Sequence, residues 1–122
     1  KLPYIYVRPT PKEHGLGNQI EGALEKGQRV LVIEDLISTG KSSLQVCDVL
    51  KAAGADVIGM VSIFTYGFQV ADEAFKKANI PYQSLTNYEN LINLALEKGT
   101  IAADEQNTLL NWRADPANWK GI

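Results

Sequence analysis

A run of thirteen residues, from Val30 to Ser42, constrains the fold of this chain more than any other stretch. It begins with four apolar, mostly β-branched residues, a pattern typical of a buried strand. Two carboxylates, Glu34 and Asp35, follow at once, and a short loop rich in hydroxyls and glycine then opens a helix. Backbone N–H groups at such a helix start suit a phosphate, and paired carboxylates can accept hydrogen bonds from ribose hydroxyls. The run therefore predicts a site for a sugar phosphate.

A P-loop is the nearest alternative, because the Gly-Lys-Ser at 40–42 matches the end of G-x-x-x-x-G-K-[ST]. It fails on spacing: the first glycine would fall at Asp35, whose charge would repel the phosphates. An ordinary strand-to-helix turn is a second alternative, in which Ser42 or Ser43 only caps the helix. That alternative does not account for two adjacent carboxylates, since like charges repel unless a ligand or hydrogen bonds offset them.

Length and composition predict a single globular domain over residues 1–122, because 45% of the residues are apolar and 21% are charged. No apolar run is long enough to cross a membrane, and no signal peptide is recognisable, so we expect no membrane partner. The net charge of −2 gives no sign of a basic surface that would bind nucleic acid, so we expect no nucleic-acid partner. The single cysteine, Cys47, is expected to be a core thiol, and its lack of a disulfide partner fits a cytoplasmic protein.

Strand-like and helix-like segments alternate along the chain. We expect strands at 3–8, 20–24, 29–33, 57–64 and 82–85, and helices at about 42–53, 71–79, 87–95 and 104–112, the third capped by Thr86. The first helix should present Val46, Cys47, Leu50 and Ala53 on one face and end at a left-handed Gly54, and 57–64 should be buried on both sheet faces. The alternation predicts an α/β domain with a mostly parallel sheet flanked by helices. Ligands of such sheets bind beyond the carboxyl ends of the strands, where residues 34–42 fall.

The run at 30–42 resembles, position for position, the phosphoribosyl-pyrophosphate (PRPP) signature of type I phosphoribosyltransferases. The resemblance implies a type I phosphoribosyltransferase-like core in which Glu34 and Asp35 hold the ribose hydroxyls. It also implies that the loop that follows binds the 5-phosphate of PRPP. That loop comprises Leu36, Ile37, Ser38, Thr39, Gly40, Lys41 and Ser42.

Residues 9–18 form a second feature of interest, because they contain two prolines, two glycines and no hydrophobic periodicity. Such a stretch predicts an exposed loop, and loops of this length often act as lids. Three cation-capable side chains, Arg8, Lys12 and His14, lie within seven residues. Together they could neutralise a departing pyrophosphate, while a closed loop would keep water from a reactive ribosyl cation.

The segment 6–22 resembles the catalytic loop of orotate phosphoribosyltransferases, and the resemblance continues through the Phe-Thr-Tyr-Gly at 64–67. It implies the C-terminal portion of such an enzyme, incomplete at the N-terminus and inactive alone, with a catalytic lid at about 8–19. The implied reaction converts orotate and PRPP to orotidine 5′-monophosphate and pyrophosphate, a step of UMP biosynthesis, with Mg²⁺ as cofactor. A homodimer, in which lid residues complete the partner's site, is also implied.

The same resemblance assigns roles to individual residues. Arg8, Lys12 and His14 would hold pyrophosphate, with Lys12 the main stabiliser of the leaving group. Ser38 would also touch orotate. The catalytic set is then Lys12, His14, Glu34 and Asp35, and no side chain would bind Mg²⁺ directly, because PRPP would carry the ion.

Two departures from the family pattern concern the base and the pyrophosphate. Pro9 stands where many members have a second basic residue, and no arginine lies between Gly59 and Phe75. Backbone N–H groups, or residues upstream of Lys1, would then have to meet the carboxylate of orotate. Two other functions stay open: a phosphoribosyltransferase acting on a purine, and a non-catalytic regulator that binds PRPP.

Overall fold

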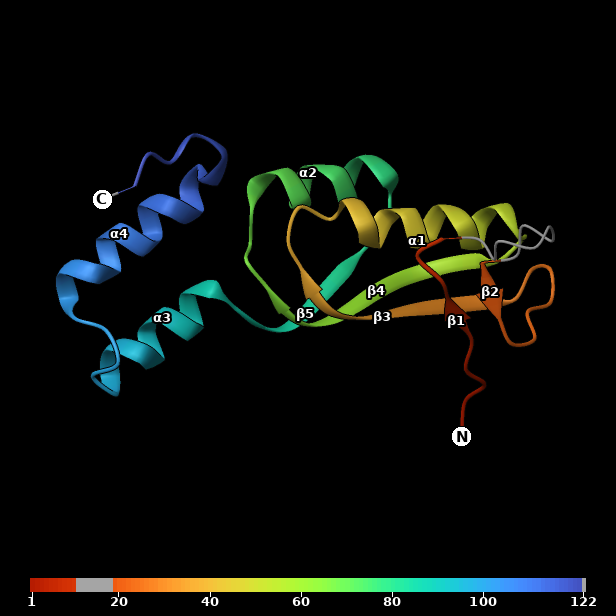
Figure 1. Ribbon diagram of the computed structural model, residues 1–122. Helices are drawn as coiled ribbons and strands as arrows, with labels where there is room; N and C mark the ends of the chain where they lie inside the picture. The colour runs from red at the N-terminus through yellow and green to blue at the C-terminus, as the bar shows by residue number, and fades with distance from the viewer. Residues whose placement is uncertain (11–18, 122) are drawn as a thin grey trace.

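The computed structural model describes residues 1–10 and 19–121 as an α/β arrangement around a parallel sheet (Figure 1). The sheet has the strand order β3 (Arg29–Ile37), β4 (Asp56–Thr65) and β5 (Tyr82–Asn87), and both pairings are parallel. Helices α1 (Lys41–Ala52) and α2 (Gln69–Ala78) connect the three strands in turn. The predicted α/β class with a parallel sheet flanked by helices is confirmed.

A short antiparallel hairpin precedes the sheet. Its strands, β1 (Tyr6–Val7) and β2 (Ile20–Glu21), are each two residues long. The predicted strands at 3–8 and 20–24 therefore exist only in part, because pairing is confined to the two positions on either side of the connecting loop. Of that loop, residues 11–18 lie outside the described part of the chain, and with them Lys12 and His14.

The hydrophobic core lies between the sheet and its two helices. Cys47 and Leu50 of α1, Met60 of β4 and Phe75 of α2 are all fully or almost fully buried there. The predicted core position of Cys47 is confirmed, and burial raises the pKa of its thiol. Ala53 was expected on the same face but is exposed, because the helix ends one residue earlier.

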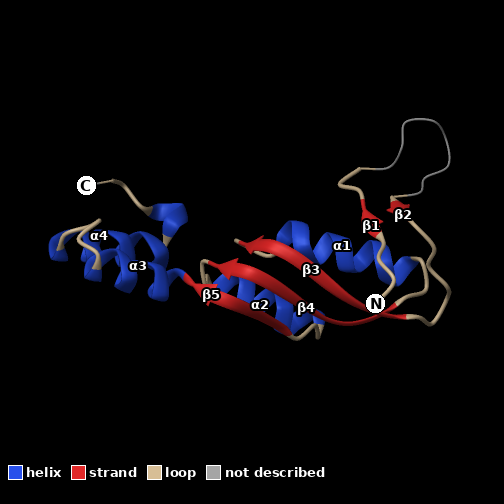
Figure 2. Cartoon of the chain, turned by 90° about the horizontal axis from the view of Figure 1, so that it is seen from below, coloured by secondary structure: helices blue, strands red, loops and turns tan. Residues whose placement is uncertain are grey.

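The opposite face of the sheet carries no helix in the described part of the chain (Figure 2). Large aliphatic side chains are exposed there: Ile33 at 69%, Ile63 at 58% and Leu85 at 78%. The expectation that strand 57–64 is buried on both faces is therefore wrong for this chain. Its continuous apolar character nevertheless matches parallel strands that are covered on both sides.

The C-terminal part forms a separate helical layer beyond the end of β5, made of α3 (Tyr88–Glu97), α4 (Ala103–Ala114) and a 3₁₀ turn η1 (Pro116–Asn118). Helix α3 is capped by the side chain of Asn87, which accepts from the Asn90 backbone N–H, and not by Thr86, which continues β5. Trp112 packs against three aromatic rings, of Tyr66, Phe68 and Tyr88, at 5.6–5.7 Å between centroids. Trp112 thus packs the C-terminal helices against the segment that follows β4, whereas Trp119 stays 40% exposed.

Candidate functional site

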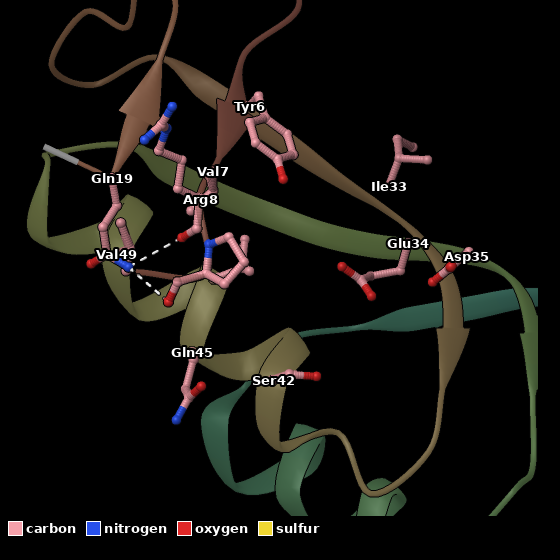
Figure 3. A pocket seen from close by; sticks show the side chains of 12 residues that line it. Tyr6, Val7, Arg8, Gln19, Ile33, Glu34, Asp35, Ser42, Gln45 and Val49 are labelled. Carbon is pink, nitrogen blue, oxygen red and sulfur yellow. Dashed lines mark hydrogen bonds between the residues drawn. The ribbon is translucent and has the colours of Figure 1, made fainter. Parts of the chain in front are cut away.

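The candidate site is a pocket of about 610 Å³ between the β1–β2 hairpin and the edge formed by β3 and α1 (Figure 3). This volume lies in the range typical of small-molecule sites. Its lining residues are Tyr6, Val7, Arg8, Pro9, Gln19, Ile33, Glu34, Asp35, Ser42, Gln45, Val46 and Val49. The pocket thus brings together four of the predicted site residues, Arg8, Glu34, Asp35 and Ser42, from three separate elements.

Strand β3 positions both carboxylates of the pocket. The strand was expected to stop at Ile33, but it continues to Ile37 because Glu34, Leu36 and Ile37 pair with β4. The predicted phosphate loop is correspondingly shorter, since only residues 38–40 separate β3 from α1. The side chain of Ile37 is fully buried in the core, so only its backbone is available to a ligand.

Glu34 and Asp35 occupy different environments although they are neighbours. The carboxylate of Glu34 is half-buried and points away from its strand into the space facing the hairpin (Figure 3). Asp35 is exposed, and its Oδ1 accepts a hydrogen bond from the Leu36 backbone N–H at 2.7 Å. Because the Asp35 side chain is held against its own strand, Glu34 is the carboxylate that reaches furthest into the pocket.

Three influences act on the pKa of Glu34. Burial raises it first, the neighbouring charge of Asp35 raises it further, and a hydrogen bond from Ser43 lowers it, with a net upward shift. Ser43 lies in the first turn of α1 and is only 2% exposed. A ligand hydroxyl that donated to Glu34 would stabilise its ionised form in the same way as Ser43 does.

The turn from β3 into α1 is shaped by Gly40. Its φ is +85°, a conformation that L side chains rarely adopt, and a Cβ there would lie 2.9 Å from Cε2 of Phe75. Because glycine has no capping side chain, the first backbone N–H groups of α1 are not satisfied from Gly40. Such groups at a helix start suit an anion.

Residues 38–41 do not line the pocket, although Ser42, which follows them, does. Ser38, Thr39, Gly40 and Lys41 instead form the adjoining turn, where the Thr39 hydroxyl accepts from the Lys41 backbone N–H at 3.4 Å. The pocket and this turn are therefore neighbouring parts of one surface, joined at Ser42.

Arg8 supplies the positive charge on the hairpin side of the pocket. Its Nε donates to Oε1 of Glu21 at 2.6 Å, and its backbone N–H donates to the Gln19 carbonyl oxygen, also at 2.6 Å. A cation on one side and two carboxylates on the other suit a ligand with both phosphate and hydroxyl groups. The lining positions of Tyr6, Gln19, Gln45 and Val49 were not predicted, because nothing in their local sequence distinguishes them from surface residues.

Within residues 1–10 and 19–121, no three His, Cys, Asp or Glu side chains are grouped so that they could hold a metal ion. The same part of the chain contains no helix with the length and apolar character needed to cross a bilayer.

Comparison with known proteins relates this geometry to a family. Residues 7–97 match the family model described as "Phosphoribosyl transferase domain". An orotate phosphoribosyltransferase of Bacteroides thetaiotaomicron is 54% identical over 118 residues, which cover 97% of this chain and 56% of the relative. The chain thus spans about half the length of the curated relatives it matches.

Solved structures show the same likeness. Orotate phosphoribosyltransferase from Aeropyrum pernix superposes with a TM-score of 0.64 at 31% identity, covering 80% of this chain and 52% of that one. A Mycobacterium tuberculosis orotate phosphoribosyltransferase in complex with PRPP superposes with a TM-score of 0.55 at 33% identity, covering 60% and 43% of the two chains. The adjoining turn and every lining residue of the pocket except Tyr6 lie within the matched span of 7–97.

Proposed function

This chain belongs to the phosphoribosyltransferase family, and we propose that it carries the PRPP-binding and catalytic part of an orotate phosphoribosyltransferase. The proposed reaction transfers the ribose 5-phosphate of PRPP to orotate. It forms orotidine 5′-monophosphate and pyrophosphate in the pyrimidine pathway to UMP. The observation that carries the proposal is the pocket, whose lining includes Arg8, Glu34, Asp35 and Ser42, in a chain 54% identical to a named orotate phosphoribosyltransferase.

The proposed binding of PRPP follows from the charges in the site. Glu34 and Asp35 accept hydrogen bonds from the ribose 2- and 3-hydroxyls, and the turn at 38–42 binds the 5-phosphate through backbone N–H groups and hydroxyls. Leu36 and Ile37 contribute only as the end of the strand that presents this turn. Ser38, at the start of the turn, is assigned the additional contact with orotate.

The bond that breaks joins C1 of ribose to an oxygen of pyrophosphate. As this bond lengthens, negative charge develops on the pyrophosphate. Arg8 lines the pocket at the start of the lid, and its positive charge is proposed to stabilise the leaving group. The ring nitrogen N1 of orotate then bonds to C1 and loses its proton to solvent, so that a C1–nitrogen bond replaces the broken C1–oxygen bond. Lys12 and His14, which lie outside the described residues, are proposed to add to the positive charge, with Lys12 the principal contributor.

Mg²⁺ is the proposed cofactor, bound through the phosphate oxygens of PRPP and not by protein side chains. Because Glu34 and Asp35 are assigned to the ribose hydroxyls, the phosphate oxygens of PRPP are the hard oxygen ligands that would hold the ion. When bound, the ion neutralises charge on the pyrophosphate. A homodimer completed by lid residues and a cytoplasmic location are further parts of the proposal.

The proposal is tested by an assay in which PRPP and Mg²⁺ are added and the consumption of orotate is measured from its ultraviolet absorbance. The complete gene product that contains this sequence is assayed beside the 122-residue chain. In the complete gene product we expect turnover that requires orotate, PRPP and Mg²⁺. This turnover should be lost in the double variant that combines Glu34→Gln with Asp35→Asn. A panel of purine bases is the control for specificity. Turnover of a purine in place of orotate would favour the purine-type enzyme, and PRPP binding without turnover of any base would favour a regulator.

A further inference from the structure

Backbone hydrogen bonds join the two arms of the β1–β2 hairpin as far as Arg8. Tyr6 pairs with Glu21 and Val7 with Ile20 in the antiparallel ladder. The Arg8 N–H then extends this ladder by donating to the carbonyl oxygen of Gln19 at 2.6 Å. Arg8 is thus the last residue of the first arm that the hairpin holds by a backbone hydrogen bond within the described part of the chain.

The side chain of Gln19 adds a second connection between the two arms. Its Nε2 donates to the carbonyl oxygen of Arg8 at 3.1 Å and to that of Pro9 at 3.4 Å, as the dashed lines in Figure 3 show. One amide group therefore bridges two successive carbonyl oxygens. Because Pro9 has no N–H of its own, this carbonyl contact is a means of holding the backbone after Arg8.

The side chain of Glu21 holds the other end of Arg8. Its Oε1 accepts from Nε at 2.6 Å, which uses only one of the five N–H groups of the guanidinium. The described residues offer the two Nη groups of Arg8 no partner. Since the guanidinium is planar, fixing Nε also fixes the plane of the Nη edge, the edge that forms paired hydrogen bonds with phosphate oxygens.

We propose that Gln19 and Glu21 are positioning residues for Arg8, which hold its backbone and its guanidinium so that the Nη edge can bind a pyrophosphate group. The inference deepens the proposed function and rests on it for the identity of the ligand. Arg8, Pro9 and Gln19 all line the pocket, whereas Glu21 acts from outside it. Nothing in the order of residues along the chain singles out Gln19 or Glu21, because their contacts with Arg8 exist only in the folded hairpin.

Substitution of Gln19 tests the backbone part of the proposal in the complete gene product. In Gln19→Ala we expect the KM for PRPP to rise about threefold to tenfold, as for loss of one hydrogen-bonding side chain, while kcat changes about twofold or less. Gln28→Ala is the matched control. Gln28 is an exposed glutamine whose side chain accepts from the Glu25 backbone N–H at 3.1 Å, in a turn that does not line the pocket. Its KM for PRPP should not change.

Substitution of Glu21 tests the side-chain part. Glu21→Ala should raise the KM for PRPP, and Glu21→Gln should restore much of the loss, because the amide oxygen still accepts from Nε. A lower KM for PRPP in Glu21→Ala would be the result that contradicts the proposal. If Glu21 withheld Arg8 from the ligand, Glu21→Ala would lower the KM for PRPP, and the proposal would be overturned.

Two measurements are independent of turnover. Hydrogen exchange of the Arg8 amide in the 122-residue chain should become about threefold to tenfold faster in Gln19→Ala and stay unchanged in Gln28→Ala. The Kd for inorganic pyrophosphate with Mg²⁺ should rise in both Gln19→Ala and Glu21→Ala. If orotate is not turned over but both changes are seen, the proposed function fails and the positioning role stands. If orotate is turned over and neither the KM nor the exchange rate changes, the positioning role fails.

Discussion

The two sides of the pocket are built in different ways, although each supplies charged groups to the same space. On the core side, β3 and α1 place Glu34 and Ser42 next to the main hydrophobic cluster, with Ile37 and Leu50 buried close behind them. On the hairpin side, Arg8 is held by a ladder of two residue pairs and a few exposed hydrogen bonds. The carboxylate side is therefore part of the packed core, whereas the arginine side depends on a small number of local contacts.

The largest effect is expected in the core, next to the turn at 38–40. Ile37→Ala should lower the free energy of unfolding by about 2–5 kcal/mol, because the side chain is fully buried and its removal leaves a cavity. Ile33→Ala is the matched control, being the same residue type in the same strand but 69% exposed on the open face. It should cost about 0.5 kcal/mol or less. Urea unfolding of both variants measures the difference, and equal losses would show that the open face is covered in solution.

Gly40 is the next position at which the core side can be altered. Gly40→Ala should destabilise by roughly 1–3 kcal/mol, because it combines an unfavourable positive φ with a contact of 2.9 Å to the ring of Phe75. Gly27→Ala separates the two causes. Its φ of +84° is nearly the same, but a Cβ there meets no atom within 4 Å, so it should lose only the conformational part. Thermal unfolding that gave both variants the same loss would rule out a steric role for Phe75.

A titration tests how the core side sets the charge of Glu34. Because the hydrogen bond from Ser43 lowers the pKa of Glu34, Ser43→Ala should raise that pKa further. Carbon-13 NMR of the Glu34 carboxyl group measures it directly. Ser62→Ala is the matched control, since Ser62 is as deeply buried but bonds instead to Ser84 and to the Phe64 carbonyl oxygen. An equal shift in both variants would contradict a specific role for Ser43.

The same pKa predicts the sign of a pH effect on stability. A carboxyl whose pKa is raised on folding binds more protons in the folded state, so its contribution to stability falls as pH rises from the unfolded pKa through the folded one. Glu34→Gln should remove this part of the pH dependence. Urea unfolding at several pH values across that window measures it, and an unchanged slope in Glu34→Gln would assign the effect to other groups.

The smallest effect on stability is expected on the hairpin side. The Arg8–Glu21 pair is partly exposed, with side-chain accessibilities of 36% and 43%, and such pairs contribute about 0.2–1 kcal/mol. A double-mutant cycle of Arg8→Ala and Glu21→Ala, read by urea unfolding, should give a coupling energy in this range. A coupling of several kcal/mol would mean that the hairpin is as integral to the fold as the core side.

The comparison also explains which expectations succeeded. The helices expected at about 42–53 and 71–79 are present at 41–52 and 69–78, because hydrophobic spacing and glycine are signals that act over a few residues. The end of β3 was misplaced by four residues, because Glu34 to Ile37 join the strand only by pairing with β4. The cap of α3 moved from Thr86 to Asn87 for a similar reason, since Thr86 pairs with Phe64 in the sheet.

By itself the sequence determined the α/β class, the burial of Cys47, and the succession of strand, turn and helix around Glu34, because each depends on residues close together in the chain. The tertiary structure alone decided that Arg8 lines the same pocket as Glu34 and Ser42, that Gln19 and Glu21 contact Arg8, and that no described helix covers one face of the sheet. These are contacts between segments separated by many residues, and no local pattern records which distant side chains will meet. The site depends on local sequence, which supplies its chemical groups, and on long-range packing, which places these groups around one pocket.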